Sequence, residues 1–378
     1  MRNRGSIRGV QQSAGSGGPS GQPDGKPWSP NWRLDDPAAA TVPQSHRRNP
    51  PARQPARSPR PPAPSFYRDP TLGGTALDRF DQHDTDDAAR LDWRGLVHRV
   101  IGIDLGPGKN TAYENELRNR IRAVVGGAFP IAVLNLKGGV GKTSVVEALG
   151  STFAATRDDP VIALDLDAGD LVERHGRQNP LSMADLLTGE AVTQYADIRA
   201  HTYMNGFGLE VLGAPDYARS DWQLERRDVV KAISILRMHY SVMLVDCVKA
   251  LNSSVMEAVL PESRALVVVT STSIDAIRKA KTTLEWLYHN GYQRFMRSTV
   301  LAINHVEPAK VDPVAATELE RLSARVAATV VLPFDRHVHE GKKIALDRLS
   351  KESRRAYLEM AAALADMFPG RGVDRARR

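Results

Sequence analysis

Residues 138–144 combine three glycines, a lysine and two hydroxyl side chains in the order Gly-Gly-Val-Gly-Lys-Thr-Ser. Glycines adopt backbone angles closed to other residues, so consecutive N–H groups can turn inward on an anion. Lys142 then supplies a positive charge for phosphate groups, and the Thr143 hydroxyl supplies an oxygen ligand for Mg²⁺. The spacing therefore predicts a site for the phosphates of a nucleotide. Its predicted contacts are Gly138, Gly139, Val140, Gly141, Lys142, Thr143 and Ser144.

Such a site needs a strand before the glycine turn and a helix after it. An apolar strand starts at residue 131, and residues 144–155 carry apolar side chains at helical spacing. A helix that starts at the turn presents its free N–H groups to the anion. This order of strand, turn and helix distinguishes the motif from a plain glycine-rich turn.

Five further apolar runs read as strands, and most are continuous rather than alternating. Continuous apolar strands separated by helical patterns are typical of a mainly parallel sheet buried on both faces. We therefore predict a doubly wound α/β fold with helices on both faces of the sheet, as in P-loop nucleotide-hydrolysing proteins. The predicted strands are residues 161–166, 241–245, 265–270, 299–303 and 328–332, and helical patterns include residues 182–187 and 228–239.

Acidic side chains stand where two of these strands end. Asp165 and Asp167 close one strand, and Asp246 closes another. Ligands of doubly wound sheets lie at the carboxyl ends of the strands, and Mg²⁺ prefers oxygen ligands. The sequence therefore predicts a Mg²⁺ site formed by Thr143, Asp165 and Asp246.

The glycine turn departs from the ordinary phosphate-loop pattern, because Leu136 occupies the position of the first glycine and Lys137 follows it. The sequence KGGVGKTS resembles the deviant phosphate loop (deviant Walker A motif) of the ParA/MinD family of ATPases. The resemblance extends over roughly residues 128–368. It implies ATP and Mg²⁺ as cofactors and an ATP-dependent homodimer, in which Lys137 reaches the nucleotide of the partner subunit.

The same resemblance assigns roles to further residues. It implies that Asp165 lies near the attacking water, with Lys137 and Lys142 completing the catalytic set, and that Asp246 ends the Walker B strand. Asn304 would face adenine, and the turn at residues 332–341, which contains Pro333, would pack near the base. No Asn-Lys-x-Asp segment follows the strand at 299–303, which favours ATP over GTP.

The leader, residues 185–189 and the C-terminal residues 345–368 more narrowly resemble the MinD-like ATPases associated with mycobacterial type VII (ESX) secretion, sometimes called EspI-like. This implies a role in secretion or in its regulation. The chain departs from the wider family after Asp246, where Val248, Lys249 and Ala250 replace small, flexible residues. A β-branched valine resists backbone movement, so this departure favours a nucleotide-binding adaptor with low turnover as an alternative.

Residues 1–75 hold 14 of the 24 prolines and are predicted to be a disordered Pro/Arg/Gly-rich tail. Residues 1–70 carry eleven Arg or Lys against four Asp, which accounts for the whole net charge of +7. We expect this tail to recruit protein partners. An acidic linker and N-terminal extension follows at 76–127, then the ATPase domain at 128–369 and a basic tail at 370–378. Within the extension, a Gly-Pro-Gly turn at 106–108 and an amphipathic helix at 113–125 are expected.

No apolar run approaches the roughly 20 residues that span a bilayer, and the single cysteine, Cys247, fits a reducing compartment. A cytoplasmic location is expected. Two alternatives remain within the same fold. A partition ATPase would bind DNA nonspecifically through residues such as Arg278 and Lys279, or the C-terminal arginines, with a steep salt dependence. A MinD-like membrane switch would need a free amphipathic C-terminal helix, but the apolar stripe at 351–368 is expected to pack on the domain.

Overall fold

The computed structural model describes residues 107–369, except for 168–169, 190–193 and 217–219. The predicted Pro-rich tail, most of the acidic extension and the basic residues 370–378 lie outside the described residues. The boundaries proposed at residues 75 and 127 therefore remain predictions.

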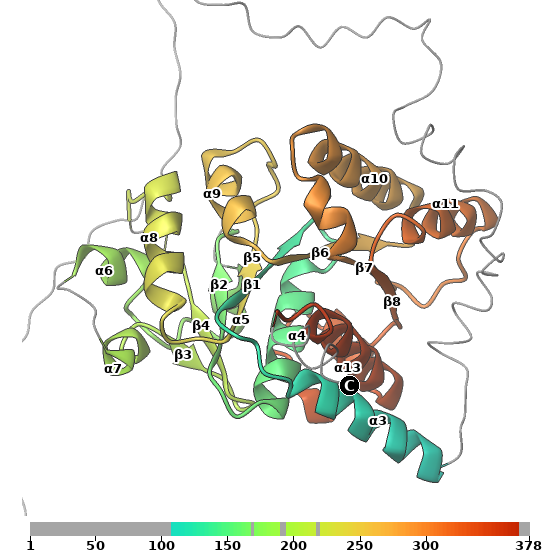
Figure 1. Ribbon diagram of the computed structural model, residues 1–378, viewed down its shortest axis with the longest axis horizontal. Coiled ribbons are helices and arrows are strands. Elements are labelled where there is room, and N and C mark those ends of the chain that lie inside the picture. The colour runs from blue at the N-terminus through green and yellow to red at the C-terminus, as the bar shows by residue number, and fades with distance from the viewer. Residues whose placement is uncertain (1–106, 168–169, 190–193, 217–219, 370–378) are drawn as a thin grey trace, which may run out of the picture. The chain divides into compact units, whose positions relative to one another are not determined.

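An eight-stranded sheet forms the centre of the described part, with strand order β3-β4-β2-β5-β1-β6-β7-β8 (Figure 1). Every neighbouring pair is parallel except β3 and β4. This confirms the predicted doubly wound, mainly parallel sheet. The strands are β1 (Phe129–Leu134), β2 (Val161–Asp165), β3 (Tyr203–Met204), β4 (Leu209–Leu212), β5 (Val242–Asp246), β6 (Ala265–Ser271), β7 (Thr299–Asn304) and β8 (Ala328–Leu332).

The strands are apolar throughout because both faces of the sheet are covered. In β1, Ile131 and Val133 belong to the core on one face, and Ala132 and Leu134 belong to the core on the other. All six strands predicted from apolar runs are present in the structure, with ends that differ by one or two residues. The apolar runs are thus explained by burial on two sides.

Strands β3 and β4 were not predicted. For β4 the reason is a buried acidic residue within the strand. Glu210 interrupts the apolar residues of β4 and is only 1% exposed. Its carboxylate accepts hydrogen bonds from the hydroxyl groups of Tyr240, at 2.6 Å, and Thr202, at 2.9 Å. These partners come from other elements, so the burial of Glu210 depends on tertiary contacts.

Helices α3, α4 and α13 cover one face of the sheet (Figure 1). The rings of Phe129 in β1 and Phe368 after α13 pack edge to face with centroids 4.8 Å apart, which ties the segment after α13 to the sheet. The bounds are α3 (Pro107–Ile121), α4 (Lys142–Thr156) and α13 (Lys351–Ala365).

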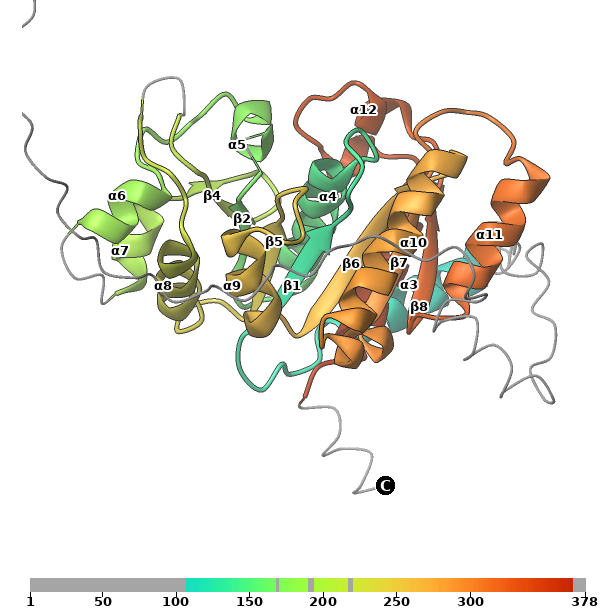
Figure 2. The ribbon, with the colours of Figure 1, turned by 90° about the horizontal axis from the view of Figure 1, so that it is seen from above.

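The other face is covered by α8, α9, α10 and α11, while α5 and α12 lie at the same end of the sheet as the start of α4 (Figure 2). The bounds of the long helices are α8 (Arg226–Leu236), α9 (Ser254–Glu262), α10 (Ile274–His289) and α11 (Pro313–Ser323). The short ones are α5 (Asp170–Arg174), α6 (Met183–Thr188), α7 (Tyr195–Arg199) and α12 (Arg336–His339), with 3-10 turns η1 (Gln293–Arg297) and η2 (Leu346–Arg348).

The prediction of a turn at residues 106–108 is wrong for Pro107 and Gly108, because these are the first two residues of α3. Proline suits the first turn of a helix because its fixed φ is helical and its missing N–H needs no partner there. Leu117 and Ile121 of this helix are buried and pack in the core that α13 shares. Packing therefore places the helix six residues earlier than the periodicity predicted.

Helix α13 packs on the domain, as expected for the apolar stripe near the C-terminus. Most of its apolar side chains, among them Tyr357, Met360 and Leu364, are at most 7% exposed. Helix α4 lies close to the sheet at Gly150, where an added Cβ would come within 2.9 Å of the methyl groups of Leu209 and 3.1 Å of Leu244. Glycine at this position permits that close approach.

Candidate phosphate-binding and nucleotide-binding site

The glycine loop joins the end of β1 to the start of α4 and requires glycine at Gly141. This residue caps the helix with φ of 90°, and an added Cβ would lie 2.4 Å from the side-chain nitrogen of Asn304. The same Asn304 nitrogen donates a hydrogen bond to the carbonyl of Val140 at 2.9 Å. The end of β7 therefore holds the loop in place through one amide side chain.

Asn135 fixes the other end of the loop. It is 1% exposed, its side-chain oxygen accepts a hydrogen bond from the N–H of Lys137 at 2.9 Å, and its side-chain nitrogen donates to the carbonyl of Val269 in β6. The sequence reasoning did not identify this residue. A buried polar residue directly after an apolar strand is the signal that could have indicated it.

Three lysines lie around the loop, and each pairs with an aspartate. The ammonium of Lys142 lies 2.9 Å from Asp167 Oδ2, and that of Lys249 lies 3.9 Å from the same oxygen. Lys137 pairs with Asp275 at the start of α10 in the same chain. Burial alone would lower the pKa of Lys142, but the nearby carboxylates raise it above its usual value. Lys142 is therefore held in its charged form.

Asp165 and Asp246 are brought together because β2 and β5 are parallel neighbours. The two residues are paired in the register of these strands, and neither is exposed to solvent. Burial, and for Asp165 the charge of Asp246, raises the pKa values to about 7 for Asp165 and about 6 for Asp246, against the hydrogen bonds and the charge of Lys142 that lower them. Asp165 Oδ2 accepts hydrogen bonds from the N–H groups of Leu171 at 2.9 Å and Val172 at 3.1 Å.

The remaining carboxylate oxygens fit a hard cation. Within the described residues, Asp165 Oδ1 and both oxygens of Asp246 are buried without a hydrogen bond of normal geometry, and the Thr143 hydroxyl approaches Asp246 closely enough to lower its pKa. The described residues contain no cluster of three or more His, Cys, Asp or Glu side chains that could hold a metal by themselves. Mg²⁺ typically takes one or two carboxylates and completes its shell with phosphates and water, so Thr143 and Asp246 fit such a site.

A cavity of about 340 Å³ opens beside the loop, which is a size typical of small-molecule sites. Residues from the loop, from the ends of β7 and β8 and from α5 line it, among them Gly141, Ser144, Arg174, Asn304 and Pro333. Both residues expected near the base thus border one cavity with the loop. Asn304 also contacts the loop backbone itself, which the sequence did not predict.

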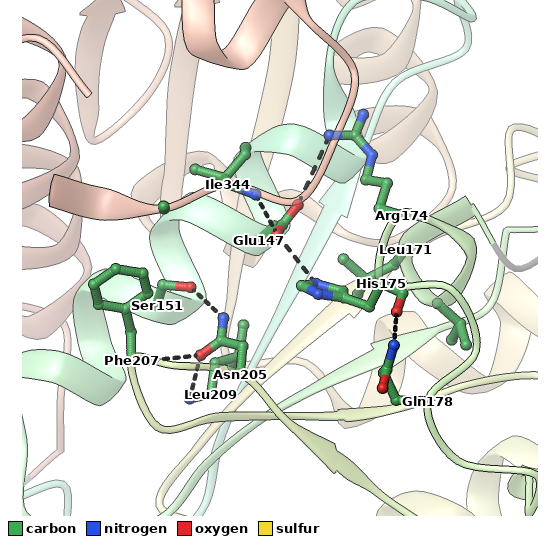
Figure 3. Close-up of polar contacts among 12 residues, drawn as sticks. Glu147, Ser151, Leu171, Arg174, His175, Gln178, Asn205, Phe207, Leu209 and Ile344 are labelled. Carbon is green, nitrogen blue, oxygen red and sulfur yellow. Dashed lines mark hydrogen bonds and ion pairs between the residues drawn. The ribbon is translucent and has the colours of Figure 1, made fainter. Parts of the chain in front are cut away.

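A second group of residues behind the loop was missed by the sequence reasoning (Figure 3). Glu147 of α4 has no exposed surface, and its Oε1 accepts a hydrogen bond from the N–H of Ile344 at 2.7 Å. The same oxygen lies 3.1 Å from His175 Nε2, and Oε2 lies 3.8 Å from Arg174. Apart from Lys142, Glu147 is the only charged residue of a helix that is otherwise apolar or small, and this was the available signal.

The predicted residues of the phosphate end therefore lie around the ends of β1, β2 and β5, and those of the base end lie at the end of β7 and directly after β8. Lys137 is the exception, because its ammonium turns to Asp275 of its own chain. Cys247 is fully buried, and burial raises the pKa of its thiol, as expected for a packing residue. Arg278 and Lys279 are exposed on α10, whereas the C-terminal arginines lie outside the described residues.

Comparison with known proteins identifies a family of nucleotide-binding domains. The sequence model of the CobQ/CobB/MinD/ParA nucleotide-binding domain matches residues 131–344. The ESX-1 secretion-associated protein EspI of Mycobacterium tuberculosis (strain H37Rv) is 39% identical over 285 residues, covering 74% of this chain and 43% of that protein. The chain thus spans less than half the length of this curated relative.

Other similar proteins are more distant. A putative septum site-determining protein MinD of Mesostigma viride is 29% identical over 183 residues, covering 47% of this chain and 60% of that protein. The crystal structure of a ParA family ATPase from Chlorobium tepidum superposes with a TM-score of 0.52 at 18% identity, covering 62% of this chain and 98% of that one, which shows a shared fold. In the part of the chain that the structure describes, no helix is both long and apolar enough to cross a membrane.

Proposed function

This chain belongs to the CobQ/CobB/MinD/ParA family of nucleotide-binding domains, and we propose that it binds MgATP, hydrolyses it to ADP and phosphate, and forms a homodimer while ATP is bound. One observation carries the proposal. The carboxylates of Asp165 and Asp246 lie side by side at the carboxyl ends of adjacent parallel strands, and the Lys142 ammonium, directly after the glycine loop, is close enough to Asp246 to lower its pKa. Phosphate charge and a divalent cation are the ligands that this combination suits.

In this proposal the N–H groups at the start of α4 and the Lys142 ammonium bind the phosphates. Mg²⁺, when bound, would neutralise charge on the phosphates, and Thr143 and Asp246 would hold it. Asn304 and Pro333 border the cavity that would take the base. The proposed site therefore has a phosphate end at the glycine loop and a base end in the cavity beside it.

Asp165 is suited to orient the attacking water. Two backbone N–H groups at the start of α5 fix Oδ2, so Oδ1 is positioned and has no hydrogen bond among the described residues. A pKa of about 7 allows this carboxyl to accept a proton near neutral pH. Asp165 would thus align water and take up its proton during in-line attack.

The proposed dimer uses Lys137, which would contact the phosphates of the partner subunit. Its present ion pair with Asp275 joins side chains that are 35% and 62% exposed, and exposed ion pairs are weak. Lys137 can therefore exchange Asp275 for a phosphate at little cost. The similarity to EspI supports a role associated with type VII secretion, in which the N-terminal tail recruits a partner.

The test uses the full-length chain and two substitutions at the loop. We expect Lys137→Ala to abolish ATP-dependent dimerisation in light scattering while the monomer still binds nucleotide. Lys142→Ala should lose nucleotide binding itself, and Lys351→Ala, at an exposed position of α13, should change neither. Unchanged dimerisation of Lys137→Ala would contradict the dimer. Nucleotide binding without hydrolysis, with or without residues 1–75 and in the presence of candidate partners, would favour the low-turnover adaptor.

A further inference from the structure

Lys249 packs over the glycine loop of its own chain. It follows β5 by three residues, in the segment where the sequence departs from the small residues usual in the family. Its Cε lies 3.7 Å, and its Nζ 4.0 Å, from the point that a Cβ on Gly138 would occupy. The aliphatic part of Lys249 thus covers the first glycine of the loop, although the side chain is 53% exposed.

The ammonium of Lys249 faces the same carboxylate oxygen as the buried Lys142. The distances to Asp167 Oδ2 are 3.9 Å from Lys249 and 2.9 Å from Lys142, and the Asp167 side chain is only 12% exposed. Two positive charges therefore converge on one anionic oxygen directly beside the loop. A phosphate oxygen carries similar charge and accepts hydrogen bonds from ammonium groups in the same way.

The position of Lys249 relative to the cavity indicates which phosphate it would meet. The cavity for the base borders Gly139, Gly141 and Ser144, whereas Lys249 packs on Gly138. A nucleotide whose base occupies this cavity would run its phosphates along the loop, away from the base. Its last phosphate would then lie nearest to Lys249.

We propose that Lys249 is a specificity-determining residue that binds the terminal phosphate of ATP within the same subunit, exchanging Asp167 for that phosphate. This inference rests on the proposed nucleotide binding and extends it. Lys249 would distinguish a triphosphate from a diphosphate before any partner subunit contributes Lys137. The departure at residues 248–250 would then add a charge to the site in addition to stiffening the backbone.

The experiment measures the dissociation constants of the magnesium complexes of ATPγS and ADP by calorimetry on the full-length protein. Lys249→Ala should weaken binding of ATPγS by about tenfold, as expected for a charged hydrogen bond at a partly exposed site, and binding of ADP by less than about twofold. Lys249→Arg keeps the charge and should stay within about threefold of the unchanged protein for both ligands. Lys351→Ala, which removes an exposed lysine from the start of α13, is the matched control and should change neither constant.

The outcomes separate the two proposals. If the unchanged protein binds neither nucleotide, the proposed function fails. If it binds both and Lys249→Ala weakens both equally or neither, the role of Lys249 is overturned while nucleotide binding stands. Circular dichroism of each variant checks folding, and Lys249→Met, which keeps an unbranched apolar stem without the charge, replaces the alanine variant should that one unfold. Selective loss of ATPγS binding in either uncharged variant supports the proposal.

Discussion

Two buried acidic side chains, Asp246 beside the start of α4 and Glu147 within α4, differ in the partners of their carboxylates. At the first turn of α4, the Asp246 carboxylate is buried without a normal hydrogen bond from the described residues, and burial raises its pKa to about 6. Further along the helix, Glu147 is equally buried, but its Oε1 accepts a hydrogen bond from the N–H of Ile344, and its carboxylate forms ion pairs with His175 and Arg174. A buried charge needs partners, so a carboxylate that lacks them inside the chain is suited to a cation from outside. The contrast separates the proposed cation site from a structural contact.

The largest effect on stability is expected at Glu147, the carboxylate that has partners within the chain. Glu147→Ala should lower the free energy of unfolding by about 3–5 kcal/mol, because it removes one member of a buried charged group and leaves His175 and Arg174 without their acid. Urea denaturation measures this. Glu318→Ala, which breaks an exposed ion pair with Arg321 on α11, is the control and should cost less than about 1 kcal/mol. Equal losses for the two variants would remove the distinction drawn for Glu147.

A substitution at Asp246 is expected to raise the stability of the nucleotide-free chain rather than lower it. Asp246→Asn should reduce ATP hydrolysis by about 100-fold or more, because it removes a charge that would hold the cation against the phosphates. In the absence of nucleotide, the same variant should be more stable than the unchanged chain at pH 8, by about 5 °C in Tm. A lower Tm of Asp246→Asn at pH 8 would show that Asp246 contributes to stability like Glu147.

The raised pKa values of the two aspartates explain why Asp246→Asn should stabilise the chain at pH 8. Asp165 and Asp246 have pKa values of about 7 and about 6 in the folded chain, above their usual value of 3.8, so the folded state binds their protons more tightly than the unfolded state. Their contribution to stability is fully present below the unfolded pKa and is lost as the pH rises through 6 and 7. Asp246→Asn removes one of the two groups and the charge that raises the pKa of the other. Urea denaturation of nucleotide-free protein between pH 4 and 8 should show a shallower slope for this variant.

The smallest effect is expected at an exposed acid. Asp275→Asn releases Lys137 from its ion pair, so ATP-dependent dimerisation should strengthen by no more than about threefold, with no measurable change in Tm. Sedimentation at several protein concentrations measures the dimer constant. Asp347→Asn, at an exposed position of η2, is the control. Weaker dimerisation of Asp275→Asn would mean that the pair supports the dimer contact rather than competing with it.

The sequence predicted the features that depend on local pattern. Apolar runs indicated six strands, and parallel order placed Asp165 and Asp246 at one edge of the sheet before the structure paired them. The residues it missed depend on contacts between distant segments. Glu147 meets Ile344 across 197 positions of sequence, and Lys137 meets Asp275 across 138. Lys249 stands out in the sequence only as a departure from the family, and its proximity to Gly138 and Asp167 depends on the fold.

Gly150, in the middle of α4, has a consequence for the glycine loop at the start of that helix. It lies eight residues after Lys142, about 12 Å along α4, and its lack of a side chain lets the helix rest on Leu209 and Leu244. A methyl group at this position would clash with Leu209 and Leu244 and push α4 away from the sheet. Because the helix is continuous, Lys142 would shift with it. The position of Lys142 relative to the strand ends therefore depends in part on how closely α4 packs on the sheet at Gly150.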